Sequence, residues 1–153
     1  MEDLSLPDVL RFVAAANAAR RDRDAPAADA ERRLDALFRT SETLAVYGTL
    51  APGQPNHHIV EPLGGEWSDG VIEGDLFPAG WAAELGYLAF RPRPGGAPVA
   101  VQVLTAPALA TAWPMLDDFE GPEYQRILVP VFRAAGERRL YTVANLYAAA
   151  GEE

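Results

Sequence analysis

Apolar side chains recur at helical spacing twice within residues 1–40. The first run includes Val9 and follows Ser5, whose hydroxyl suits the cap of a helix. We expect Asp24 or Asp29 to cap a second helix. These two helices have too few apolar positions for a core of their own. We therefore expect this arm to pack on the rest of the chain or on a second copy of it.

From residue 41 the pattern changes to short runs of alternating apolar residues, which predict strands. The strand at residues 66–77 is expected to break near Asp69-Gly70, and the strands at 87–90 and 99–104 to form a hairpin. A second hairpin follows, with Ile127, Val129 and Val131 on one buried face. The expected strands span residues 43–47, 66–77, 87–90, 99–104, 124–132 and 140–147.

One helix interrupts the strands. It is expected to open at Pro107 and to end at Gly121-Pro122, with one apolar face formed by Leu109, Trp113, Leu116 and Phe119. The chain is therefore predicted to have an α+β fold, a small mixed and mostly antiparallel sheet curled towards a barrel with flanking helices. Residues 1–40 form the N-terminal helical arm of this prediction, and residues 41–153 form its main domain.

The composition limits the kinds of catalytic and metal site that the chain can form. Hydrophobic residues make up 49% of the chain, which indicates a globular protein. The chain has no cysteine and no lysine, which excludes disulfides, thiolate metal sites, cysteine nucleophiles, P-loops and Schiff-base lysines. The two histidines, His57 and His58, are adjacent, so we expect no zinc site.

The net charge and the apolar runs limit the partners that the chain can bind. The net charge is −9, and residues 41–153 carry −8 of it, which disfavours nucleic acid. No apolar run is long enough to span a bilayer. The sequence starts with Met1-Glu2-Asp3, acidic where a signal peptide needs positive charge, so a cytoplasmic protein is expected.

One stretch predicts a strand that ends at a binding loop. The apolar residues before Tyr47 are followed by Gly48-Thr49-Leu50 and then by Pro52-Gly53. We expect Gly48 and Gly53 to adopt backbone geometry that a side chain would forbid. N–H groups freed at such a strand end can hold an oxyanion or a carboxylate. The alternative is a tight turn with no function.

Four acids, Asp117, Asp118, Glu120 and Glu123, crowd the expected end of the helix. Helix C-termini disfavour negative charge, and crowding of this kind raises the proton affinity of a carboxylate. A partly desolvated Glu120, with Asp117 on the same face, would suit a general acid/base. The alternative is that all four acids are solvated.

The two stretches together resemble the γ-glutamyl cyclotransferase-like superfamily. The resemblance rests on Tyr47-Gly48-Thr49-Leu50 with Gly53, on Leu116-Asp117-x-Phe-Glu120-Gly121, and on Tyr124-x-Arg126. The continuation Gly53-Gln54-Pro55-Asn56-His57 is more similar to the γ-glutamylamine cyclotransferase branch. The resemblance covers about residues 43–147 and leaves the first forty residues outside it.

The resemblance implies an activity and roles. Tyr47, Gly48, Thr49 and Leu50 would form a loop that holds the γ-glutamyl group, and Glu120 would move the proton. The free α-amine of a small γ-glutamyl compound attacks its own γ-carbonyl, an acyl transfer to an internal amine. It releases 5-oxoproline and an amine or amino acid. Proximity drives such a cyclisation, so no metal and no cofactor is expected.

Further residues have two interpretations each. Tyr124 either lines the pocket or packs in the core. Arg126 either contacts substrate or, as we favour, pairs with an acid of the acidic cluster. Asn56 and His57 either touch the leaving group or lie at the surface. The three tryptophans, Trp67, Trp81 and Trp113, are expected in the core or the pocket wall.

Two other functions stay open at this point. The same fold could serve as a non-catalytic binding or regulatory domain, with the arm as its interaction surface or as the contact of a homodimer. Alternatively, the enzyme could remove a γ-glutamyl protecting group from a larger amine, which would require a wider cleft.

Overall fold

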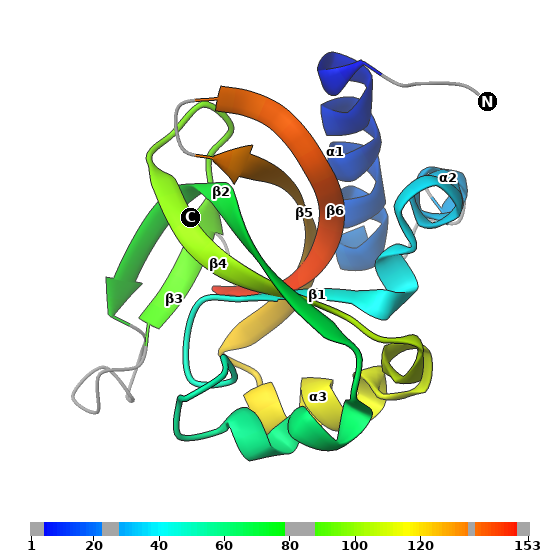
Figure 1. The fold of residues 1–153 in the computed structure, drawn as a ribbon. Coiled ribbons are helices and arrows are strands. Elements are labelled where there is room, and N and C mark those ends of the chain that lie inside the picture. The colour runs from blue at the N-terminus through cyan, green and yellow to red at the C-terminus, as the bar shows by residue number, and fades with distance from the viewer. Residues whose placement is uncertain (1–4, 23–27, 79–87, 135–136, 150–153) are drawn as a thin grey trace.

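The computed structural model describes residues 5–22, 28–78, 88–134 and 137–149. Within them a strongly curved sheet has the strand order β3-β2-β4-β1-β6-β5. Pairing of Val71 with Phe132 joins β2 to β5 and closes five strands into a barrel, with β3 as an extra strand (Figure 1). The α+β barrel fold predicted from the sequence is confirmed. The strands are β1 (Thr43–Val46), β2 (Glu66–Pro78), β3 (Leu88–Pro92), β4 (Pro98–Thr105), β5 (Tyr124–Ala134) and β6 (Glu137–Ala149).

The expected hairpin between the third and fourth strands is wrong. Both β3 and β4 pair with β2 instead, since this strand is 13 residues long and has room for two partners in succession. Gly74 pairs with Pro92, and the adjacent Glu73 pairs with Pro98. The final hairpin of β5 and β6 is confirmed.

The expected break near Asp69-Gly70 is also wrong, because β2 runs through both residues. Gly70 instead allows two strands to approach closely. A Cβ there would lie 2.5 Å from Cγ1 of Val131, beside the pairing that closes the barrel. Gly70 therefore allows the barrel to close and does not form a turn.

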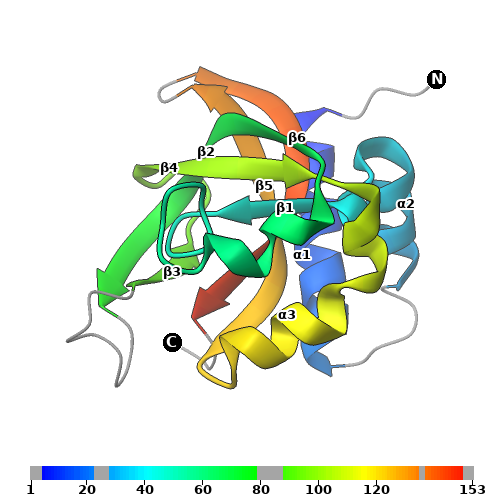
Figure 2. The ribbon, with the colours of Figure 1, turned by 60° about the horizontal axis from the view of Figure 1, so that its bottom comes forward.

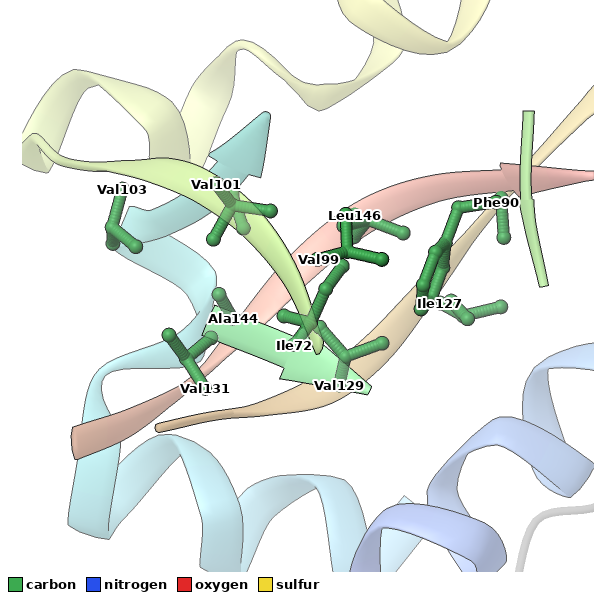
Figure 3. Packing of buried hydrophobic residues seen from close by; sticks show 12 residues of the cluster. Ile72, Phe90, Val99, Val101, Val103, Ile127, Val129, Val131, Ala144 and Leu146 are labelled. Atoms are coloured by element: carbon green, nitrogen blue, oxygen red, sulfur yellow. The ribbon is translucent and has the colours of Figure 1, made fainter. Parts of the chain in front are cut away.

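The barrel interior is filled by alternating side chains of its strands. Ile127, Val129 and Val131 point inward together, as predicted, against Ile72 and Phe90 (Figure 3). A second apolar cluster lies between the outside of β1 and the helical segment 107–120. All four residues of β1 are therefore buried, since the strand is covered on both faces.

The internal helix consists of a 3₁₀ turn at Pro107–Thr111 followed by α3 (Trp113–Glu120). Trp113 and Leu116 are buried, as predicted. Phe119 was expected on the same apolar face, but 40% of it is exposed. The helix ends where predicted, at Gly121, whose left-handed φ of 84° only glycine adopts easily.

The arm consists of α1 (Leu6–Asp22) and α2 (Ala28–Phe38). Ser5 caps α1 as predicted, since its Oγ accepts the N–H of Asp8 at 3.3 Å. Asp29 does not cap α2, because the helix already begins at Ala28; Asp24 lies outside the described residues.

The arm packs on its own barrel. Val9, Val13 and Leu34 belong to one buried apolar cluster with Leu128 of β5 and Val143 of β6. In both views α1 lies beside these two strands, on a different side of the barrel from α3 (Figures 1 and 2). A homodimer through the arm stays a prediction. No helix within the described ranges has the length and apolar character needed to cross a membrane.

Candidate functional site

A cavity of about 1190 Å³ brings the two sequence motifs together. The loop after β1 contributes one wall, and the end of α3 with the start of β5 contributes another. All six predicted site residues line it: Tyr47, Gly48, Thr49, Leu50, Glu120 and Tyr124. Residues separated by about seventy positions in the sequence thus face one space.

The loop is held from behind by the turn that follows it. The N–H of Asn56 donates to the carbonyl of Thr49 at 2.8 Å, and its Nδ2 donates to the Thr49 hydroxyl at 2.9 Å. Nδ1 of His57 lies 3.0 Å from the Leu50 carbonyl, and its ring lies against Trp67. Asn56 and His57 therefore support the loop.

The backbone N–H groups of this loop matter for binding, because the cavity is lined by the residues that carry them. Among the described residues, none accepts a hydrogen bond from the N–H of Gly48, Thr49 or Leu50. These donors are available to a bound oxyanion or carboxylate.

The two glycines of the loop differ. Gly53 has a left-handed φ of 82°, as expected. The expectation is wrong for Gly48, which is absent from the positive-φ glycines. A Cβ on Gly48 would meet no atom within 4 Å, so the residue leaves space open at the cavity wall rather than permitting an unusual backbone.

Glu120 is the last residue of α3 and is half-buried at the cavity. Burial raises the pKa of its carboxyl to about 7. Burial raises the pKa of the Tyr47 phenol, and the charges of Tyr124 and then Glu120 raise it further. Glu120 can therefore both accept and release a proton near neutral pH.

Asp117, one turn earlier on α3, is held as an ion. Nε and Nη2 of Arg126 donate to its two carboxyl oxygens at 3.0 and 3.4 Å, and the Tyr147 hydroxyl donates to Oδ1 at 2.7 Å. Burial alone would raise its pKa, but the hydrogen bonds from Arg126 and Tyr147 outweigh burial and lower the pKa. The predicted pairing of Arg126 with this acidic cluster is confirmed.

Arg126 is itself fixed on several sides. Its Nη1 donates to Oδ1 of Asn145 at 3.1 Å, and its guanidinium lies 4.6 Å from the ring centre of Trp113. Nε1 of Trp113 in turn donates to the Ser41 carbonyl at 3.0 Å. The start of β5 is thereby tied to α3 and to the segment before β1.

Tyr147 is a cavity residue that sequence reasoning missed. Its hydroxyl donates to Asp117, and its carbonyl accepts the Tyr47 hydroxyl at 2.6 Å. The one available signal was its phenol at the end of an apolar strand, because a buried tyrosine hydroxyl requires a partner.

The other charges at the cavity wall are Asp69, Glu123 and Arg133. No group of three or more His, Cys, Asp or Glu side chains suited to a metal ion occurs within the described residues.

Comparison with known proteins decides the family. The family model "Gamma-glutamyl cyclotransferase, AIG2-like" matches residues 44–153. The chain belongs to this family. The matched segment contains all six predicted site residues and leaves the N-terminal helices outside. Membership supports a cyclotransferase enzyme in general. No curated protein matches the chain in sequence.

Solved structures share the fold of this γ-glutamyl cyclotransferase family member. The crystal structure of a mouse AIG2-like protein (A2LD1, GGACT) is 24% identical with a TM-score of 0.54, over 71% of this chain and 77% of that one. The solution structure of A2LD1 is 25% identical with a TM-score of 0.51, over 73% and 80%. A uropathogenic E. coli-specific protein is 17% identical with a TM-score of 0.50, over 71% and 79%.

Proposed function

We propose that this protein is a γ-glutamyl cyclotransferase that converts a small γ-glutamyl compound into 5-oxoproline and a free amine or amino acid. The proposal rests on one cavity, which is lined both by the half-buried Glu120 and by Gly48–Leu50, whose N–H groups have no acceptor among the described residues. Burial raises the pKa of the Glu120 carboxyl to about 7. Residues 41–153 form the catalytic domain in this proposal, and residues 1–40 form an arm attached to it.

Glu120 acts first as a base. The α-ammonium of the substrate cannot attack a carbonyl, so the Glu120 carboxylate takes one proton from it. The nitrogen lone pair then forms a bond to the γ-carbonyl carbon, and the carbonyl π electrons move onto oxygen. General acid/base catalysis of this kind is worth about 10²–10⁴-fold in rate.

The loop binds the charge that develops. The oxyanion accepts hydrogen bonds from the N–H groups of Gly48, Thr49 and Leu50, which have no acceptor among the residues that the structure describes. A preorganised donor of this kind is worth roughly 2.7–4 kcal/mol in the transition state. The backbone, rather than the side chain of Thr49, supplies this binding.

Glu120 acts next as an acid. When the oxyanion collapses, the bond from the former γ-carbonyl carbon to the leaving nitrogen breaks, and the leaving nitrogen takes a proton from the Glu120 carboxyl. The remaining proton of the attacking amine goes to solvent or to the leaving amine. Asp117 takes no part in the proton transfer, because Arg126 and Tyr147 already bind its carboxylate.

The size of the cavity allows leaving groups of different sizes. Its volume of about 1190 Å³ exceeds the roughly 300–1,000 Å³ of ordinary small-molecule sites. The test is therefore a panel of γ-glutamyl amines, γ-glutamyl dipeptides, glutathione and γ-glutamyl derivatives of larger amines, with 5-oxoproline followed by mass spectrometry. Turnover of at least one class is expected, and release of 5-oxoproline from none of them would contradict the proposal.

A further inference from the structure

The N-terminal helix α1 replaces a missing neighbour strand of β5. Near its start, β5 pairs with β6 on one side, whereas its pairing with β2 is confined to Phe132, further along the strand. On the open side Asn17 pairs with Leu128 as a strand would. Its Nδ2 donates to the Leu128 carbonyl at 2.9 Å, and its Oδ1 accepts the Leu128 N–H at 2.8 Å.

Arg20, one turn further along α1, continues this pairing. Its Nη1 donates to the Arg126 carbonyl at 3.1 Å, the next group on the same side of β5. Its Nε donates to Glu31 of α2 at 3.1 Å, and the Arg20 side chain is only 16% exposed. The arm therefore binds the backbone of the residue whose side chain holds Asp117.

A second cavity lies at the contact between the arm and the start of β5. It has a volume of about 520 Å³ and lies where Arg20 and Glu31 of the arm meet Asp117 and Arg126. Tyr124 and Tyr147 line both this cavity and the larger one. Two residues therefore separate the candidate site from a cavity that the arm helps to form. The arm itself lies outside the segment that the family model matches.

We propose that Arg20 is a positioning residue of the site, which fixes the start of β5 and, through the Arg126 side chain, the Asp117 carboxylate and the Tyr147 hydroxyl. The inference rests on the proposed function, since it assigns the arm a role in that same site. Arg20 touches no reacting atom. It acts by keeping Tyr124 and Tyr147 in place at the cavity wall.

A titration measures this role without turnover. The positive charge of Arg20 contributes to the lowered pKa of Asp117, after the hydrogen bonds and charge of Arg126 and the hydrogen bond of Tyr147. Among the described residues, the other ionisable groups at this cavity are Arg20 of α1, Glu31 of α2, Tyr124 and Arg126 of β5 and Tyr147 of β6. Glu120 lies one turn away from Asp117 on α3. Carbon-13 NMR of the Asp117 carboxyl, assigned with Asp117→Asn, reports its pKa directly.

The experiment compares Arg20→Ala with two controls in the full chain. Val9→Ala loosens the same helix at a wholly buried position in the arm–barrel core. Arg11→Ala removes an arginine from the same helix whose side chain is 71% exposed and pairs with Asp8. Carboxyl titrations, melting temperatures, and kcat and KM for any substrate found are measured for all three variants.

The expected result is specific to Arg20. Arg20→Ala should raise the pKa of Asp117 and lower kcat/KM by at least about 10-fold, as displaced cavity walls misplace the substrate. Both controls should keep both values near wild type, even where Val9→Ala melts earlier. If Arg20→Ala does not fold, Arg20→Gln, which retains an N–H donor without the charge, should change both values in the same directions.

Two outcomes would overturn the inference. One is an Asp117 pKa or a kcat/KM that stays at wild type in Arg20→Ala. The other is an equal loss of kcat/KM in Val9→Ala at an equal drop in melting temperature. Absence of turnover in the wild type would instead refute the proposed function, and the carboxyl titration alone would then decide whether Arg20 holds Asp117.

Discussion

Asp117 and Glu120 lie one turn apart on α3, yet their carboxyls have opposite acidities. Arg126 and Tyr147 hydrogen-bond to Asp117 and outweigh its burial, so its pKa is lowered. Glu120 is more strongly affected by burial, and its pKa rises to about 7. Two neighbouring carboxyls whose environments separate their pKa values in this way are assigned different roles, one structural and one in proton transfer.

The pH dependence of turnover should follow Glu120. The base must be ionised to accept a proton, so kcat/KM should rise with pH and its acid limb should have a midpoint near the Glu120 pKa of about 7. The measurement is kcat/KM from about pH 4, below the ordinary glutamate pKa, to about pH 9 for wild type and Asp117→Asn. The limb should persist in Asp117→Asn. A midpoint near the ordinary glutamate value of 4.5 would contradict the assignment.

The pH dependence of stability should have the opposite sign. The folded state binds the Glu120 proton more tightly than the unfolded chain does, so the contribution of Glu120 to stability is fully present below the ordinary pKa of 4.5 and is lost as pH rises through about 7. Glu120→Gln should remove this dependence, which is worth at most a few kcal/mol. Melting temperatures of both proteins at pH 5 and pH 8 check it. The advantage of the variant should grow with pH, and a constant difference would argue against a buried, titrating carboxyl.

Gly48 and Gly53 should respond differently to a side chain. A Cβ on Gly48 meets no atom within 4 Å, and this residue lies at the cavity wall. Gly48→Val should therefore fold with a melting temperature near wild type and lose most activity. Gly53 has a φ of 82°, so Gly53→Val should cost about 1 kcal/mol of stability or more. Thr49→Ser should be mild, because the proposed binding uses the backbone of the loop rather than this side chain. An active Gly48→Val would show that this wall does not touch substrate.

The sequence predicted the residues at the cavity that belong to local patterns, but not the one that depends on a distant partner. Tyr47–Leu50 and Glu120 could be located because a strand end with glycines and a crowded helix end are local patterns. Tyr147 could not, because its hydrogen bond joins it to a residue 30 positions away. The three segments that form β2, β3 and β4 were predicted as strands, but the pairing of β3 with β4 was wrong for the same reason. Alternation predicts that a segment is a strand, but register with a partner depends on tertiary contacts such as the approach of Gly70 to Val131.

The arm too could be predicted from the sequence only in part. Its helices and the Ser5 cap follow from spacing and hydrogen-bonding groups nearby in the chain. That Asn17 and Arg20 would complete the open side of β5 does not follow, since both are ordinary polar residues of a helix surface in the sequence. Phe119 was placed in the core by spacing alone, whereas it lies at the cavity rim.

In the proposed reaction Glu120 moves the proton, and replacing its carboxyl with an amide tests this role. Formation of 5-oxoproline is measured for wild type, Glu120→Gln and Asp118→Asn, the last a matched removal of an exposed acid from the same helix. Glu120→Gln should lose at least about 10²-fold in kcat, whereas Asp118→Asn should stay near wild type, with all three proteins folded. Full activity in Glu120→Gln would show that Glu120 does not transfer the proton.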